Sequence, residues 1–328
     1  MSNALQKLQD LEPSTEEFRA AVLNGLRQPQ KALPCKFFYD AEGSRLFERI
    51  CDLPEYYPTR TESRILERHA GDIARLIGPG ARLVEFGSGA GVKIRLLLQA
   101  LERPAAYVPV DISRLHLLST ASSLAKDFPH LVIAPICADY TQPFALPAQA
   151  SATPAVTIGF FPGSTIGNFT PDEARLFLIN ARQLLGPGSS MIVGVDLRKE
   201  EALLIRAYDD AAGVTAAFNL NLLRRINREL GGTFQLDQFA HQARWNDALG
   251  RMEMHLMSRR AQSVEIGRDR FSFHAGETIH TENSHKYTCE QFQALARAAG
   301  YRPRAVWTDA AALFSVHLLS DAGSTGKT

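Results

Sequence analysis

The stretch that decides the fold is Arg82-Leu-Val-Glu-Phe-Gly-Ser-Gly-Ala-Gly91, in which a short apolar run passes directly into three alternating glycines. An apolar run of this length, bounded by glycine, is typical of a buried strand, and a helical pattern follows at residues 94–101. Glycines at such a turn let the backbone bend sharply and approach a ligand closely. Backbone amides exposed at the start of the helix suit a carboxylate or another anion. The stretch therefore predicts a strand, a ligand-binding turn and a helix.

Further apolar runs follow the first one, with helical patterns between most of them. The runs span residues 106–110, 131–136, 155–161 and 190–195, and the helical patterns span residues 115–128 and 171–185. Strands that alternate with helices indicate an α/β fold whose parallel sheet is covered on both faces.

The alternation stops after residue 195. Residues 201–230 are expected to be helical, residues 234–273 contain strand-like runs, and a helix at 289–299 precedes two runs that suit an antiparallel hairpin. The first thirty residues predict an amphipathic helix. The sheet domain is therefore expected to be interrupted by a second domain.

The expected boundaries are the following. The sheet domain comprises residues 61–195 plus 287–320, the second domain comprises residues 8–60 plus 196–286, and residues 321–328 form a disordered tail.

Composition excludes several kinds of partner. The chain has 328 residues, of which 36 are Lys or Arg and 35 are Asp or Glu, so its net charge is +1. That balance gives no electrostatic drive toward nucleic acid and no basic anchor for anionic lipid. No apolar run approaches the roughly 18 residues that a membrane span needs, and the N-terminus lacks the basic start and apolar core of a signal peptide. We therefore expect a cytoplasmic protein with a small-molecule substrate and with neither nucleic-acid nor membrane partners.

The four cysteines are Cys35, Cys51, Cys137 and Cys289. No two of them form the C-x-x-C pair that is typical of metal or redox sites, and scattered thiols fit a reducing compartment. We interpret them as small core hydrophobes, with a catalytic thiol as the alternative.

Two kinds of ligand use a glycine turn after a first strand. The dinucleotide fingerprint requires another glycine at the position that Val92 occupies. The spacing Glu85-x-Gly87-x-Gly89-x-Gly91 instead resembles motif I of the class I S-adenosylmethionine-dependent methyltransferases. A nicotinamide enzyme and a glycine turn without any ligand remain the alternatives.

Acidic residues follow the next two predicted strands. Asp111 lies at the tip of the second strand, where a carboxylate can accept hydrogen bonds from ribose hydroxyls. Asp139 and Tyr140 follow the third strand, and the resemblance to those methyltransferases assigns them to the adenine. Lys93 is expected to meet the carboxylate of the cofactor, with a solvated lysine at the helix start as the alternative. The predicted cofactor-binding residues are Glu85, Gly87, Gly89, Lys93, Asp111, Asp139 and Tyr140.

The resemblance extends over nearly the whole chain. The strings that carry it are K-F-F-Y-D-A-E-G-S-R-L-F at 36–47, L-P-E-Y-Y-P-T-R-T-E at 53–62, G-S-T-I-G-N-F-T at 163–170, R-A-Y-D-D-A-A-G-V-T-A-A-F-N at 206–219 and T-E-N-S-H-K-Y at 281–287. Together they resemble the L-histidine Nα-methyltransferases of ergothioneine biosynthesis, which convert histidine to the trimethylated betaine hercynine. The resemblance implies a Rossmann-like class I methyltransferase fold with a discontinuous second α+β domain that binds the substrate.

Methyl transfer to an amine is an in-line displacement, in which the nitrogen lone pair faces the sulfonium methyl at about 3–3.5 Å. The sulfonium is already a strong electrophile, so the protein supplies binding, orientation and electrostatics rather than a nucleophilic side chain. The amine must first lose its proton, which requires a polar acceptor or a water molecule nearby.

The resemblance also assigns the substrate residues. Those expected to position the backbone end and the reacting nitrogen of the amino acid are Tyr39, Tyr56, Gly163, Asn168 and Tyr208, with Tyr39 and Asn168 as the catalytic pair. Glu282 and Ser284 are expected to bind the imidazole, because a carboxylate and a hydroxyl can satisfy its N–H donor and its second nitrogen.

Each of these residues also has a purely structural interpretation. Tyr56 could pack beside a proline turn, and Tyr208 could be a core aromatic on a helix. Asn168 could cap the helix that starts at 171 or be a turn residue, and Glu282 could be an exposed charge.

A metal is not expected. His274, His280 and His285 are spaced by six and five positions, which fits no compact zinc pattern. His285 follows Ser284 directly and is a candidate for a third polar group near the imidazole.

We therefore expect a monomeric enzyme that transfers three methyl groups from S-adenosylmethionine to the α-nitrogen of L-histidine. The alternatives are a related methyltransferase that acts on another amino acid or an indole amine, and a non-catalytic protein that binds S-adenosylmethionine.

Overall fold

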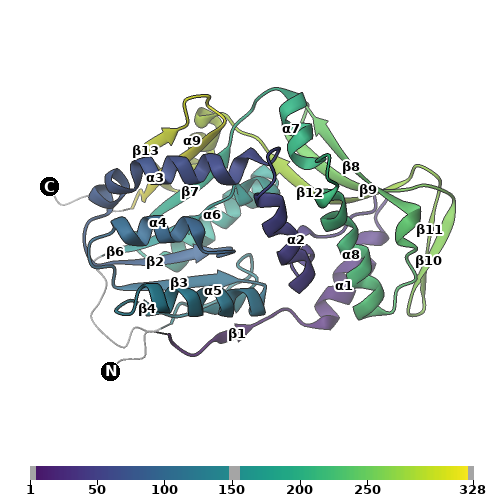
Figure 1. Ribbon diagram of the computed structural model, residues 1–328, viewed down its shortest axis with the longest axis horizontal. Coiled ribbons are helices and arrows are strands. Elements are labelled where there is room, and N and C mark those ends of the chain that lie inside the picture. The colour runs from purple at the N-terminus through teal and green to yellow at the C-terminus, as the bar shows by residue number, and fades with distance from the viewer. Residues whose placement is uncertain (1–4, 148–155, 324–328) are drawn as a thin grey trace. The chain divides into compact units, whose positions relative to one another are not determined.

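The computed structural model describes residues 5–147 and 156–323 (Figure 1). Within these residues the chain divides into two compact units. The first, called here the sheet unit, comprises Met1–Glu12, Pro58–Arg198 and Lys286–Thr328. The second, called here the insertion unit, comprises Pro13–Tyr57 and Lys199–His285.

The sheet unit contains one nine-stranded sheet. Its order is β1-β5-β3-β2-β6-β7-β14-β13, with β4 beside β3. The strands are β1 (Gln9–Leu11), β2 (Ala81–Phe86), β3 (Ala106–Asp111), β4 (Val132–Ile133), β5 (Ile136–Ala138), β6 (Val156–Phe161), β7 (Ser190–Asp196), β13 (Tyr301–Thr308) and β14 (Phe314–Asp321). β1 to β7 pair in parallel, whereas β14 runs antiparallel to both β7 and β13. The predicted parallel sheet and the predicted closing hairpin are both confirmed.

The centre of the sheet is β2, with β3 on one side and β6 on the other. The chain adds strands outward from β2 through β3 to β5, then returns across β2 to add β6 and β7. A reversal of strand order of this kind leaves a crevice at the carboxyl ends of the strands, where open α/β sheets bind their ligands. The sheet topology therefore places the glycine turn, which follows β2, at the expected ligand edge.

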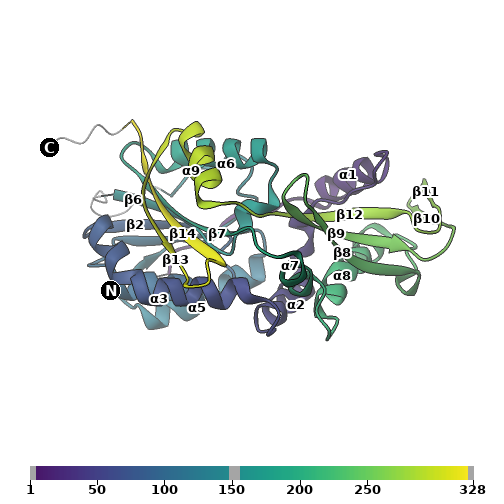
Figure 2. The same ribbon diagram turned by 90° about the horizontal axis from the view of Figure 1, so that it is seen from above.

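Helices cover both faces of this sheet (Figure 2). The helices on one face are α3 (Tyr57–Ile77), α4 (Val92–Ala100) and α5 (Arg114–Asp127), and those on the other are α6 (Pro171–Leu185) and α9 (Cys289–Ala298). Fully buried aliphatic side chains such as Leu66, Leu97 and Leu124 join the first set to the strands. Phe177 and Phe292 do the same on the opposite face.

The insertion unit combines helices with a small antiparallel sheet of order β12-β9-β8 and a separate hairpin, β10-β11. Its strands are β8 (Phe239–Asn246), β9 (Arg251–Ser258), β10 (Gln262–Ile266), β11 (Asp269–Phe273) and β12 (Thr278–His285). Its helices are α1 (Thr15–Leu26), η1 (Cys35–Phe38), α2 (Ala41–Cys51), α7 (Glu201–Tyr208), α8 (Val214–Leu230) and η3 (Leu236–Gln238). Phe38 stacks on Phe218 at 4.5 Å between ring centroids, which joins the N-terminal segment to α8.

Three predicted elements are corrected. The strand predicted at 131–136 is divided into β4 and β5, because Pro135 between them has no N–H for the ladder. The helix predicted at 201–230 is broken after Tyr208, where Asp210 accepts hydrogen bonds from the amides of Val214 and Thr215 and so starts α8 anew. The N-terminal helix covers only Thr15–Leu26, which a capping box at Ser14 starts.

Two predicted boundaries are also wrong. Residues 8–12 belong to the sheet unit, because β1 pairs with β5 through its backbone. The predicted tail begins too early, since Asp321 ends β14 and its carboxylate accepts a hydrogen bond of 3.0 Å from Arg182. Residues 324–328 lie outside the described part of the chain.

A buried ion pair fixes the point where the chain re-enters the sheet unit. Lys286 Nζ lies 2.7 Å from Asp196 Oδ2 at the end of β7, and both side chains are fully buried. We expect Lys286→Met to lower the free energy of unfolding by about 3–5 kcal/mol, because it removes one partner of a buried pair. Urea denaturation measures this loss, with Lys126→Met on the exposed surface of α5 as the matched control. Equal stabilities of the two variants would contradict the prediction.

Candidate functional site

The glycine turn after β2 has the backbone conformation that its sequence predicts. Gly87, Gly89 and Gly91 have φ values of +77°, +46° and +70°, which L side chains rarely adopt. A Cβ on Gly91 would lie 2.7 Å from Thr120 Cγ2, so this position also lacks room. A Cβ on Gly89 would meet no described atom within 4 Å. The turn is therefore closely packed at Gly91 and has open space beside Gly89, where a ligand could approach the backbone.

Asp111 joins this turn to the end of β3. One of its carboxylate oxygens accepts a hydrogen bond of 3.2 Å from the Gly89 amide, and the other accepts one of 2.8 Å from the Ser113 amide. Burial raises the pKa of the Asp111 carboxyl, although these amides act in the opposite direction. The predicted position at the strand tip is confirmed, and the predicted bond to a ribose stays a prediction.

Glu85 supports the turn from inside the sheet unit. Its side chain is 1% exposed, and its carboxylate accepts a hydrogen bond from the Tyr107 hydroxyl on β3. Burial raises the pKa of the Glu85 carboxyl to about 8, against the opposing effects of Tyr107 and Lys93. The contact that Glu85 makes in this structure is therefore with the protein, and direct cofactor binding by Glu85 stays a prediction.

Asp139 and Tyr140 follow β5, where they were predicted. Asp139 Oδ1 accepts hydrogen bonds of 2.9 and 2.6 Å from the amide and hydroxyl of Thr141. The Tyr140 ring packs edge-on against Phe86 and Phe177. Tyr140 also lies near the glycine turn, because a Cβ on Gly87 would be 3.9 Å from Tyr140 Cε1.

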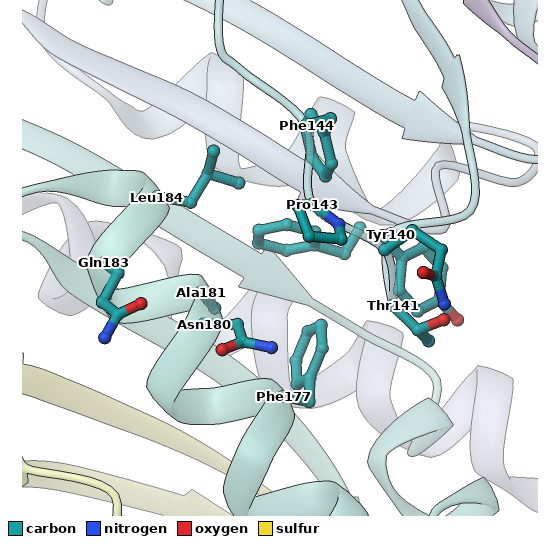
Figure 3. Close-up of a pocket in the computed structure, with 11 residues that line it drawn as sticks. Tyr140, Thr141, Pro143, Phe144, Phe177, Asn180, Ala181, Gln183 and Leu184 are labelled. Atoms are coloured by element: carbon teal, nitrogen blue, oxygen red, sulfur yellow. The ribbon is translucent and has the colours of Figure 1, made fainter.

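A cavity of about 250 Å³ lies beside Tyr140 (Figure 3). Aromatic and aliphatic side chains from α6 and from residues 140–144 line most of it, and the amides of Asn180 and Gln183 lie at its rim. Among the predicted site residues, Tyr140 alone lines this cavity, and the glycine turn and Asp111 do not. The cavity is therefore not the predicted cofactor site as a whole.

A buried carboxylate that the sequence did not single out joins two predicted site residues. Glu62 on α3 is fully buried, and its Oε2 lies 2.5 Å from Lys93 Nζ and accepts a hydrogen bond of 2.8 Å from the Gly163 amide. Glu62 is the last residue of the string at 53–62, but glutamate is most often exposed, so the string gave no signal of its role. The Lys93 side chain is only 15% exposed, so the solvated alternative for Lys93 is wrong.

Gly163 and Asn168 lie in the loop after β6. Gly163 and Ser164 both have positive φ values, and the Ser164 hydroxyl accepts a hydrogen bond of 2.9 Å from the Asp196 amide. Asn168 ends the short helix η2 (Thr165–Asn168). The cap of α6 is Thr170, whose side chain forms a capping box with Glu173. The interpretation of Asn168 as that helix cap is therefore wrong.

The insertion unit brings the other predicted site residues together. The Tyr208 hydroxyl at the end of α7 donates a hydrogen bond of 2.7 Å to Ser284 Oγ on β12. The Tyr56 ring lies 6.3 Å from the Tyr208 ring. Burial raises the pKa of the Tyr56 phenol well above its usual value, and Tyr208, Tyr39 and Glu282 add to this effect. Tyr39, Tyr56, Tyr208, Glu282 and Ser284 therefore form one cluster of hydroxyls and a carboxylate, called here the hydroxyl cluster.

The backbone that presents Tyr39 is held by Asp40. The Asp40 carboxylate accepts hydrogen bonds from the Gly43 amide, from Asn221 Nδ2 and from Arg228 at 2.7, 2.8 and 2.6 Å. Burial raises the pKa of the Asp40 carboxyl, but these three donors outweigh it and lower the pKa overall. The Tyr39 ring packs edge-on against Phe218 at 5.8 Å. Helix α8 thus fixes both the backbone and the ring of Tyr39.

Comparison with known proteins assigns the family. The model of the family described as histidine-specific methyltransferase, SAM-dependent, matches residues 18–321. The chain belongs to this family.

Three relatives are similar to this chain over most of its length. A histidine N-alpha-methyltransferase of Mycolicibacterium smegmatis is 41% identical over 93% of this chain and 95% of its own. An ergothioneine biosynthesis protein 1 of Neurospora crassa is 31% identical over 85% of this chain and 32% of its own. A 4-dimethylallyltryptophan N-methyltransferase of Epichloe festucae var. lolii is 29% identical over 88% of this chain and 90% of its own.

A methyltransferase of this family needs S-adenosylmethionine, and the glycine turn fits it. Open space lies above Gly89, and Asp111 retains acceptor lone pairs beside the amides that it already binds.

Among the described residues, no helix is both long and apolar enough to cross a membrane.

The prediction that the four cysteines are core residues holds for one of them. None forms a disulfide; Cys137 is buried, whereas Cys35, Cys51 and Cys289 are only partly buried. Burial raises the pKa of the Cys137 thiol to about 12 and also raises the pKa of the Cys289 thiol.

The three histidines singled out in the sequence are not brought together. His280 on β12 instead lies beside Glu253 and His255 on β9, and the nearest ligand atoms of these three lie within 4.8 Å of one another. The His255 and His280 rings stack at 4.7 Å with an angle of 16° between their planes. Nearly parallel rings do not direct their in-plane lone pairs to one point, so this arrangement does not favour a metal. The absence of a metal stays a prediction.

Glu85 gives a testable pH dependence. Burial raises the pKa of the Glu85 carboxyl to about 8 in the folded protein, from an ordinary value of 4.5. Between these values the folded state holds a proton that the unfolded state has lost, so this group makes stability fall as the pH rises toward about 8. We expect Glu85→Gln to remove this fall.

Urea denaturation without cofactor at several pH values between about 5 and 8 measures the difference between wild type and Glu85→Gln. Glu290→Gln, at an exposed site on α9, is the control and should follow the wild type. If the Glu85→Gln variant and the wild type lose stability in parallel, the carboxyl does not hold its proton.

Proposed function

We propose that this protein transfers methyl groups from S-adenosylmethionine to the α-amino nitrogen of L-histidine, three times in succession, and gives hercynine. Membership of the histidine-specific methyltransferase family supports the reaction class. The observation that carries the choice of histidine is the bond from the Tyr208 hydroxyl to Ser284 Oγ, in the same cluster as the Glu282 carboxylate. The relative named for ergothioneine biosynthesis supports a place in that pathway.

The imidazole of the substrate would be bound by Glu282 and Ser284. The neutral ring carries one N–H donor and one nitrogen acceptor, so a carboxylate and a hydroxyl match it. A hydrogen bond to a charged group contributes about 1.5–3 kcal/mol, which corresponds to roughly 10- to 150-fold in affinity. Ligands that lack the N–H would lose this charge-assisted hydrogen bond, which is how such sites reject them.

S-adenosylmethionine supplies the activated methyl group, and the residues of this chain bind and orient. The glycine turn and Asp111 would hold the nucleoside, with Asp139 and Tyr140 toward the adenine. Lys93 would meet the carboxylate of the cofactor, while Glu62 holds the Lys93 ammonium in place. Tyr39 and Asn168 are proposed to orient the amino group, whose proton leaves to a polar acceptor or water before each transfer.

The rival within this family acts on an indole amine, as the name of the Epichloe relative indicates for that protein. An indole ring has one N–H and no ring nitrogen that accepts, so it could not accept a hydrogen bond from the Ser284 hydroxyl as an imidazole nitrogen could. The rival of another class is a protein that binds S-adenosylmethionine without turnover.

The reaction itself is tested by incubating the protein with S-adenosylmethionine and L-histidine and analysing the products by mass spectrometry. We expect mono-, di- and trimethylhistidine, with one S-adenosylhomocysteine for each methyl group. A panel that includes tryptophan and other amino acids decides the substrate. A folded protein that methylates tryptophan in preference to histidine, or methylates neither, contradicts the proposal.

Glu282→Ala tests the recognition of the imidazole. We expect histidine binding to weaken by at least about tenfold, because a charge-assisted hydrogen bond is lost. Affinity for S-adenosylhomocysteine should stay within about twofold, since Glu282 is not among the residues proposed to bind the cofactor. Calorimetry measures both, with Glu265→Ala at an exposed site on β10 as the control. An unchanged histidine affinity would remove Glu282 from the site.

A further inference from the structure

The strand that carries Glu282 and Ser284 is irregular at one point. β12 pairs with β9 so that His280 lies opposite His255 and Glu282 lies opposite Met254. Thr281 is therefore the extra residue of a β-bulge, where two residues of one strand oppose one of the other. Because side chains alternate along a strand, the bulge places His280 on one face of the small sheet and Glu282 with Ser284 on the other.

Two side chains hold this bulge. His280 Nε2 lies 3.0 Å from the carbonyl oxygen of Glu282, so the imidazole N–H donates back across the bulge. The Thr281 hydroxyl donates a hydrogen bond of 3.0 Å to the Met254 carbonyl. The first of these bonds fixes the orientation of the Glu282 carbonyl. A rotation of that peptide would also change the direction of the Glu282 side chain.

The His280 ring is itself held in place. It stacks on the buried ring of His255, whose Nε2 lies 3.1 Å from Glu253 Oε2. Burial lowers the pKa of the His255 imidazole to about 4, so that ring is neutral at pH 7 and donates its Nε2 hydrogen to the carboxylate. Arg251 binds the other oxygen of Glu253 at 2.8 Å. Glu253, His255 and His280 thus form a stack that ends at the Glu282 carbonyl, called here the histidine stack.

The backbone around His280 is also fixed on its outer side. The His280 amide donates a hydrogen bond of 2.8 Å to the Lys31 carbonyl, and the Leu33 amide donates one of 2.9 Å to the His280 carbonyl. His280 therefore stands on a backbone whose amide and carbonyl are both hydrogen-bonded.

We propose that His280 is a positioning residue for substrate recognition, which holds the bulge so that Glu282 faces the other members of the hydroxyl cluster. The proposal rests on the proposed function, since it acts through the imidazole-binding role of Glu282. It needs a hydrogen-bond donor at His280 and no charge. The alternative use of the same residues is a metal centre, in which Glu253, His255 and His280 would each supply one ligand atom and the ion would hold the bulge.

The experiment compares His280→Ala with His280→Gln in steady-state kinetics. We expect His280→Ala to raise the KM for histidine about tenfold while kcat and the KM for S-adenosylmethionine stay within about twofold. His280→Gln should recover most of the loss, because a side-chain amide can donate to the same carbonyl. His274→Ala, at an exposed site in the same unit, is the control and should match the wild type.

A double-mutant cycle with Glu282→Ala separates positioning from general damage. If His280 acts through Glu282, the tenfold effect of His280→Ala should fall to less than about twofold in the Glu282→Ala background. Thermal unfolding of every variant shows whether it folds. If His280→Ala does not fold, the His280→Gln variant still measures the contribution of the side-chain donor.

The outcomes are distinct. A wild type that neither binds nor methylates histidine overturns the proposed function, and the positioning role with it. Suppose instead that the wild type methylates histidine. The positioning role alone is then overturned if His280→Ala leaves the KM for histidine unchanged. It is also overturned if His280→Ala lowers activity by the same factor in the wild-type and Glu282→Ala backgrounds. Loss of histidine binding on treatment with a chelator, restored by Zn²⁺, would also overturn it, because the histidine stack would then be a metal centre.

Discussion

Parallel strands all end at the same edge of a sheet, and this constraint arranges the functional side of the sheet unit. A parallel ladder leaves no loop within the sheet, so groups that bind a ligand must follow the carboxyl ends of the strands. β2 lies at the centre of the strand order, with the reversal of the chain beside it. The groups that follow these strand ends are the glycine turn after β2, Asp111 at the end of β3, Asp139 after β5, the loop at 163–168 after β6 and Asp196 at the end of β7.

The acidic groups at this edge have partners that hold them in one position. Glu62 binds Lys93 and the Gly163 amide with one oxygen, and Asp196 binds Lys286 where both side chains are fully buried. A buried charge without a partner costs several kcal/mol or more, so each of these pairs is strongly constrained. Under the proposed function, Lys93 would therefore meet the cofactor from a fixed point, which would reduce the entropy lost on binding.

The sequence predicted the parts of this molecule that depend on local pattern. The glycine turn and the tip position of Asp111 follow from spacing and strand context, because a positive φ and a strand end both have local signatures. β12 was not predicted as a strand, because T-E-N-S-H lacks the alternation of apolar and polar residues. The apolar side chains on that face of the small sheet come from Met252 and Met254 of β9, which lie opposite Ser284 and Glu282. Glu62 was missed because its partner Gly163 lies 101 positions away. Contacts of that range depend on the fold as a whole.

Under the proposed function, the hydroxyl cluster would distinguish an imidazole from an indole. Tyr208 donates to Ser284, so Ser284 Oγ accepts at that contact and directs its own hydrogen elsewhere. A buried Ser284 that donates, beside a Glu282 that only accepts, matches a ring with one donor and one acceptor. An indole satisfies the carboxylate but has no ring nitrogen that accepts from the serine, so it would forgo a hydrogen bond worth about 0.5–1.5 kcal/mol. Under the proposed function, selectivity against indoles therefore depends on Tyr208 and Ser284 together, and the carboxylate alone would not provide it.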